Sequence, residues 1–193
     1  QDPSSAKVSV PDYLAALEVV SEQPLRGLRV GVMERYYFEN LHPEIEVVVK
    51  KALQELTQLG AELVEVDMPL LPDLVKMQGI ITQSEAYAFH HNHLLTQQED
   101  YGAMVRKRLE VGQFIPAWAY IQAMRLREEV GREWSRIYQK IDVLVAPTTA
   151  IPAFPIGAET IELNGRQVNP RDLGVFARTP PSNFNGYPCI SVP

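Results

Sequence analysis

The sequence predicts an α/β fold in which helices alternate with parallel strands. Residues 28–33 are apolar apart from Arg29, which is typical of a buried strand. Residues 62–68 alternate polar and apolar side chains, as a half-buried strand does. Between them, Pro43 suits the first turn of a helix and Gly60 follows its end. A strand, a helix and a second strand in this order predict a right-handed crossover between parallel strands.

The helix between these two strands is the clearest of the chain. Its apolar residues recur at helical spacing and form one stripe: Ile45, Val48, Val49, Ala52, Leu53, Leu56 and Leu59. We expect further helices at residues 9–21, 74–97, 100–111 and 117–140, with Ser9 as the cap of the first and Gly112 at the end of the third.

The last third of the chain predicts short strands separated by turns. Residues 142–146 form an apolar strand that ends at consecutive proline and threonine residues. Asn164 and Gly165 lie between two short strands, at residues 160–163 and 166–168, and this dipeptide favours a two-residue hairpin turn. We expect the tail, residues 183–193, to be a loop that leads into a strand.

Composition excludes several classes of protein. The chain of 193 residues has a net charge of -6 and a pI near 5.3, which argues against a nucleic-acid partner. No apolar run is long enough to span a membrane. The single cysteine excludes an internal disulfide and favours the cytoplasm. The first residue is Gln, so we expect the chain to begin inside a longer protein or after processing.

Two candidate sites are weighed and set aside. His90 and His93 would share one face of a helix, but a zinc site requires three or four converging ligands, and we expect neither a metal nor a cofactor. Cys189 lies in an apolar segment, where burial would raise the pKa of its thiol and suppress the reactive thiolate. We interpret Trp118, Tyr120, Trp134 and Tyr138 as packing residues.

Thr148 and Thr149 follow the strand at residues 142–146. Loops at the carboxyl ends of strands line ligand crevices in open α/β sheets, so these threonines are candidates for binding a ligand. The alternative is a proline-rich connector in which the hydroxyl groups satisfy backbone atoms, and the residues alone leave both interpretations open.

Four segments, in order, resemble segments of the amidase-signature enzymes. They are Leu-Arg-Gly-Leu-Arg-Val-Gly-Val at 25–32, the helix at 100–112, Asp-Val-Leu-Val-Ala-Pro-Thr-Thr with Ile-Pro-Ala at 142–153, and the Asn-Phe-Asn-Gly-Tyr-Pro tail at 183–193. The resemblance covers nearly the whole chain and implies the C-terminal part of that fold, with a mixed β-sheet flanked by helices.

Enzymes of this family hydrolyse carboxamide C–N bonds with a serine nucleophile, a second serine that has a cis peptide bond, and a lysine base. The Gly/Ser-rich segment and the lysine motif are absent from residues 1–193, so we expect no catalytic residue here. The resemblance therefore predicts one partial domain that is inactive alone and acts on a small amide substrate together with an N-terminal catalytic portion. The alternatives are a non-catalytic interaction or assembly module and a metal enzyme that uses the face of His90 and His93.

The resemblance carries three substrate-binding candidates over to this sequence. Arg108 matches an arginine that contacts substrate in the tRNA-linked amidotransferase branch, and Thr148 and Asn183 match positions near the acyl pocket. That branch also has an aspartate where this chain has Phe176, with Asp172 nearby, and the difference favours a general amidase. Because a partial domain leaves strand edges and apolar faces uncovered, we also expect self-association.

Overall fold

The computed structural model describes residues 7–15, 21–170 and 178–192. Its helices are α1 (Glu34–Tyr37), α2 (Pro43–Gln58), α3 (Leu71–Thr96), α4 (Ala103–Glu110), α5 (Ala117–Ile137) and α7 (Pro180–Asn185). Its strands are β1 (Arg29–Val32), β2 (Glu62–Glu65), β3 (Val143–Val145), β4 (Ile161–Leu163) and β5 (Arg166–Val168). Two 3₁₀ turns, η2 (Gln98–Asp100) and η3 (Val111–Phe114), flank α4.

The central sheet has the strand order β2-β1-β3, and both pairs are parallel. Val30 of β1 lies opposite Leu63 on one side and Val143 on the other. The predicted strand–helix–strand unit and the α/β class are confirmed. The resemblance implied a mixed sheet. Among the described residues, the central sheet is parallel, and the antiparallel pairing lies in the separate hairpin of β4 and β5.

The predicted hairpin turn is also confirmed. Asn164 and Gly165 both have positive φ, at 50° and 77°, as a two-residue turn with the right twist requires. Asn164 Nδ2 donates a hydrogen bond of 3.2 Å to the Leu41 carbonyl, which fastens the hairpin to the loop before α2.

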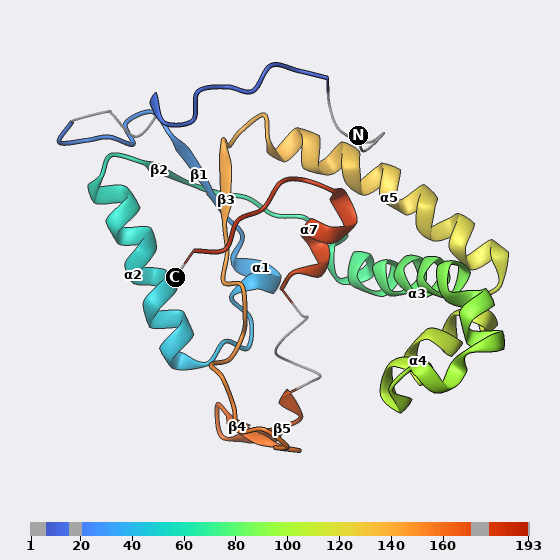
Figure 1. Cartoon of the computed structure of the whole chain (residues 1–193). Helices are drawn as coiled ribbons and strands as arrows, with labels where there is room; N and C mark the ends of the chain where they lie inside the picture. The colour runs from blue at the N-terminus through green and yellow to red at the C-terminus, as the bar shows by residue number, and fades with distance from the viewer. Residues whose placement is uncertain (1–6, 16–20, 171–177, 193) are drawn as a thin grey trace.

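Helices cover both faces of the sheet (Figure 1). Alternate residues of β1 point to opposite faces, so Val30 and Val32 pack with Leu53 of α2 and with Ala61. Met33 and Val64 point the other way, into a cluster built with α3, α5 and α7. The sheet is therefore the middle of three layers.

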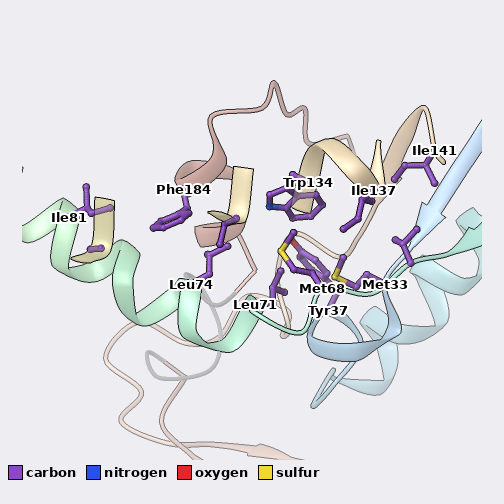
Figure 2. Packing of buried hydrophobic residues seen from close by; sticks show 13 residues of the cluster. Met33, Tyr37, Met68, Leu71, Leu74, Ile81, Trp134, Ile137, Ile141 and Phe184 are labelled. Atoms are coloured by element: carbon purple, nitrogen blue, oxygen red, sulfur yellow. The ribbon is translucent and has the colours of Figure 1, made fainter. Parts of the chain in front are cut away.

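The larger core cluster lies between the sheet and the long helices. Figure 2 shows its labelled side chains in a row from Ile81 on α3, past Phe184 and Trp134, to Ile141 beside β3. Trp134, Met68 and Leu74 are each at most 1% exposed. Full burial of one such large apolar side chain contributes about 1.5–3 kcal/mol, so this row is the main source of stability on that face.

Arg29 and Asp142 join the first strand to the third. Asp142 Oδ2 accepts a hydrogen bond of 2.8 Å from the Arg29 backbone N–H, and Oδ1 accepts one of 2.8 Å from Nη2. The Asp142 backbone N–H donates back to the Arg29 carbonyl at 2.9 Å. These hydrogen bonds lower the pKa of Asp142 to about 2, so its carboxylate stays charged at neutral pH.

Two of the expected secondary-structure elements are corrected by the structure. Residues 9–15 of the helix expected at 9–21 are not α-helical, and Asp12 rather than Ser9 accepts from the backbone N–H groups of Leu14 and Ala15. Residues 16–20 lie outside the described residues. The tail also differs, because Asn183 belongs to α7 and residues 187–192 form no strand.

The structure also differs from the sequence-based expectations at three single residues. Trp118 is 69% exposed on α5 and is not a packing residue, whereas Trp134 is buried as expected. Cys189 is exposed, because the segment around it is not in a sheet. Gly112 does not end a helix but lies buried within η3.

Among the described residues, none of the helices has both the length and the apolar composition needed to cross a bilayer.

Gly112 is required for the close approach of η3 to α3. A Cβ atom at this position would overlap the Gln83 carbonyl oxygen and the Tyr87 Cβ atom, and a backbone carbonyl cannot move aside cheaply. We expect Gly112→Ala to lower the free energy of unfolding by about 1–3 kcal/mol. Urea unfolding followed by circular dichroism measures the change.

The matched control is Gly131→Ala on α5, where a Cβ atom would meet nothing within 4 Å. Removing a helical glycine there is expected to raise the free energy of unfolding by about 0.5–1 kcal/mol. Equal effects of the two substitutions would show that η3 does not pack against α3 in this way.

Candidate functional site

A cleft of about 470 Å³ lies along β3, from Val143 at the start of the strand to Thr148 in the loop that follows it. β1 and β3 are parallel, so the segments that follow them leave the sheet at the same edge. Tyr37, after β1, and Thr148, after β3, both line the cleft. This edge is where open α/β sheets bind their ligands, and the volume suits a small molecule.

One wall of the cleft is aromatic. Tyr37, Trp134 and Tyr138 line it, and Tyr138 stacks on Tyr187 of the tail with the ring centroids 4.9 Å apart. Burial raises the pKa of Tyr37 well above its ordinary value, with a smaller contribution from Tyr36. The Tyr37 phenol therefore stays neutral and can donate or accept a hydrogen bond.

Polar side chains of the cleft come from α7, the tail and the loop after β3. Asn183 and Ser182 lie on α7, and Ser191 Oγ lies 3.2 Å from Thr148 Oγ1. This pair of hydroxyl groups joins the tail to the loop after β3. The lining of the cleft thus combines segments that are 43 residues apart in the sequence.

Local sequence explains the shape of α7. Proline at its first turn fits a position where no backbone N–H is needed, and Gly186 ends the helix with φ of 75°. Arg127 Nε on α5 donates a hydrogen bond of 2.9 Å to the Phe184 carbonyl, and Phe184 itself is 2% exposed. These contacts hold α7 beside α5 and place Asn183 at the cleft.

Arg178, just before α7, is the single cation among the described residues that line the cleft. It is 9% exposed, Nη2 donates to the Glu39 carbonyl, and its guanidinium carbon lies 5.2 Å from the centroid of the Tyr36 ring. Burial lowers the pKa of Arg178, and the neighbouring Tyr36 and Glu39 partly offset that effect. Tyr36 has φ of 76°, which is a strained conformation for a residue with a side chain.

The structure brings together two of the three binding residues that the sequence predicts. Thr148 and Asn183 line the same cleft, whereas Arg108 is exposed on α4 and is not among the residues that line it. Sequence reasoning missed Arg178 and assigned Trp134 to packing alone. No spacing rule identifies either residue as part of a site, because they reach the cleft from separate elements.

The other candidate residues stand as follows. Phe176 and Asp172 lie outside the described residues. His90 Nδ1 lies 2.9 Å from the Tyr101 hydroxyl group. The described part of the chain holds no group of three or more histidine, cysteine or acidic side chains that could bind a metal.

Cys189 also lines the cleft, with Sγ 3.5 Å from the Tyr187 carbonyl oxygen. No lysine or histidine is among the described residues that line the cleft. Its side chains can bind and orient a polar group.

The model of the Amidase family matches residues 1–193. The chain belongs to this family. It is 37% identical over 192 residues to an amidase of Pseudomonas putida, and the match covers 100% of this chain and 40% of that relative. It is 31% identical over 218 residues to a glutamyl-tRNA(Gln) amidotransferase subunit from Myxococcus xanthus, where it covers 43%. The chain therefore spans less than half the length of these relatives.

Solved structures of similar proteins support the fold. One is an inhibitor-bound complex described as revealing the evolutionary origins of an s-triazine catabolic enzyme. It matches this chain with a TM-score of 0.80 at 26% sequence identity, and the match covers 96% of this chain and 38% of that one. A second is a bacterial aryl acylamidase of the amidase signature family, with a TM-score of 0.67 at 24% identity, over 96% of this chain and 39% of that one. At that identity the second match shows the fold alone.

The contact between the tail and β3 can be tested by cross-linking. Because the two hydroxyl oxygens are 3.2 Å apart, we expect the double variant Thr148→Cys and Ser191→Cys, made with Cys189→Ser, to form an internal disulfide on mild oxidation. Mobility on non-reducing gels and mass spectrometry measure it. Each single variant is the control, since it can form only links between chains, and a double variant that stays reduced would contradict this placement of the tail.

Proposed function

We propose that this chain is the C-terminal portion of an enzyme that hydrolyses carboxamide C–N bonds and that it forms one wall of the substrate cleft. The supporting observation is the cleft itself, whose lining includes Thr148, just after β3, and Asn183 of α7. Membership of the Amidase family and coverage of 40% of the Pseudomonas putida amidase agree with a part of a larger enzyme.

The chemistry proposed for the whole enzyme is acyl transfer to a serine, followed by hydrolysis. The nucleophile, its partner serine and the lysine base would lie in the portion that this chain does not cover, because the Gly/Ser-rich and lysine motifs are absent from residues 1–193. Thr148 and Asn183 would orient the acyl group through neutral hydrogen bonds, and the aromatic wall would exclude water.

A general amidase is proposed rather than a component of an amidotransferase. The sequence has Phe176 where the amidotransferase branch has an aspartate, and the identity to the Pseudomonas putida amidase exceeds that to the Myxococcus xanthus protein, at 37% against 31%. We propose a small-molecule amide as the substrate. The single cysteine supports the cytoplasm as the compartment.

The chain by itself is expected to be inactive. A fluorophosphonate probe, which traps activated serines, should not label the 193-residue chain, because the serine-activating lysine motif is absent. The longer polypeptide that contains residues 1–193 should be labelled once per molecule, as intact-mass measurement would show. Stoichiometric labelling of the chain alone, or none of the longer polypeptide, would contradict the proposal.

Self-association of the isolated chain is also expected. Val47 and Val48 on α2 are 66% and 65% exposed, and Leu63 and Val143 on the outer strands are about 40% exposed. Such apolar surface favours contact between copies. Multi-angle light scattering should report species larger than a monomer, and Val47→Glu with Val48→Glu should reduce their mass, whereas Lys51→Gln on the same helix should not. A monodisperse monomer at high concentration would overturn this expectation.

A further inference from the structure

The surface of the chain is too large for a compact protein of its mass. A compact monomer of 21.8 kDa exposes about 9,300 Å² to solvent. This chain exposes 13930 Å², which is about half as much again. The excess, about 4,600 Å², is surface that folding within residues 1–193 leaves uncovered.

Much of the exposed apolar surface lies at the tip of the long helices, residues 89–121. Figure 1 shows α4 beyond the ends of α3 and α5, away from the sheet. Of the 20 large apolar side chains that are exposed among the described residues, eight belong to the tip. Phe89, Phe114 and Trp118 are 79%, 78% and 69% exposed. Aromatic rings gathered in one exposed region indicate an interface.

Within the tip, α4 has the least support. It contacts α3 and η3, but none of its residues is buried, and its apolar Met104 and Val105 are exposed. A helix of 8 residues is too short to be stable through its own hydrogen bonds, so its stability has to come from packing. The described residues therefore leave α4 without the buried face that a helix in a folded protein normally has.

Charge decides the class of partner that fits the tip. The tip has three acidic residues and three arginine or lysine residues, so it is neutral overall. Arg106 already pairs with Glu110, with Nε 3.9 Å from Oε1. An anionic membrane or a nucleic acid would require an excess of cations. A neutral surface rich in aromatic rings fits another protein surface.

Area decides which protein surface that is. A standard interface covers about 800 Å² on each partner, so a second copy of the chain would cover about a sixth of the excess surface. The match to the Pseudomonas putida amidase covers 40% of that relative, so a further 60% lies outside it. A portion of that size can cover several thousand Å², because parts of one domain share a core.

We propose that the tip packs against the portion of the same polypeptide that lies outside residues 1–193. The rings of Phe89, Phe114 and Trp118 are buried in that interface, and α4 gains there the packing that residues 1–193 do not supply. The proposal rests on the proposed function in requiring a longer polypeptide, but it requires no catalysis.

Hydroxyl-radical footprinting read by peptide mass spectrometry compares the 193-residue chain with the longer polypeptide. Met104, Phe114 and Trp118 are of residue types that oxidise readily when exposed. We expect their oxidation to be at least about fivefold slower in the longer polypeptide, as burial requires. Trp134, which is 1% exposed, should react slowly in both. The 193-residue chain is measured as the variant Val47→Glu with Val48→Glu at low concentration, which keeps copies apart.

Trp118→Asp supplies an independent test. Trp118 is the second residue of α5, where a carboxylate is favourable, so the change should lower the Tm of the 193-residue chain by less than about 2 °C. In the longer polypeptide it should lower the Tm by at least about 5 °C, since a charge is then buried. The matched control Trp118→Phe keeps an aromatic ring and should lower the Tm by less than about 2 °C in both polypeptides.

Two outcomes would overturn the inference. One is equal oxidation of the tip in the two polypeptides. The other is protection in the longer polypeptide that disappears on dilution to the monomer, because the partner would then be a second copy.

The fluorophosphonate probe tests the proposed function separately. A longer polypeptide whose tip is protected but which the probe does not label would reject the function and leave the interface. A labelled polypeptide whose tip stays reactive would leave the function and reject the interface.

Discussion

The pairing of β1 with strands on both sides is the constraint on which the rest of the structure depends. β2 follows β1 through α2, but β3 is more than a hundred residues away in sequence, and closing so long a loop carries an entropic cost. The hydrogen bonds between Arg29 and Asp142 define where β3 lies beside β1, since they connect both the side chains and the backbones of the two residues. Without this pairing, the loop that carries Thr148 would have no defined position beside Tyr37.

The cleft also depends on how α7 is held. Arg127 on α5 binds the Phe184 carbonyl, and Phe184 is buried among residues of α3 and α5. Arg178 then joins the start of α7 to the strained turn after β1, through the Glu39 carbonyl and the ring of Tyr36. The cleft is therefore lined by segments from four places in the sequence, and its geometry rests on packing that none of them could achieve alone.

Several elements could be predicted because their signals are local. The helix at residues 43–58 follows from proline at its start and an apolar stripe, and the hairpin follows from Asn164 and Gly165, whose positive φ the turn requires. The tail could not be predicted in this way. Residues 187–192 have the composition of a strand, but a strand exists only where another strand pairs with it, and among the described residues none pairs with this segment.

The sequence by itself determined the alternation of strands and helices, the positions of most of their ends, and the family, because periodicity, capping and turn chemistry act over a few residues. It also identified Thr148 and Asn183 as candidate binding residues through the resemblance of their segments. Only the tertiary structure placed them in one cleft with Arg178 and Trp134 and placed Arg108 outside it. The physical reason is that burial arises when segments distant in sequence pack together, and no local pattern encodes that contact.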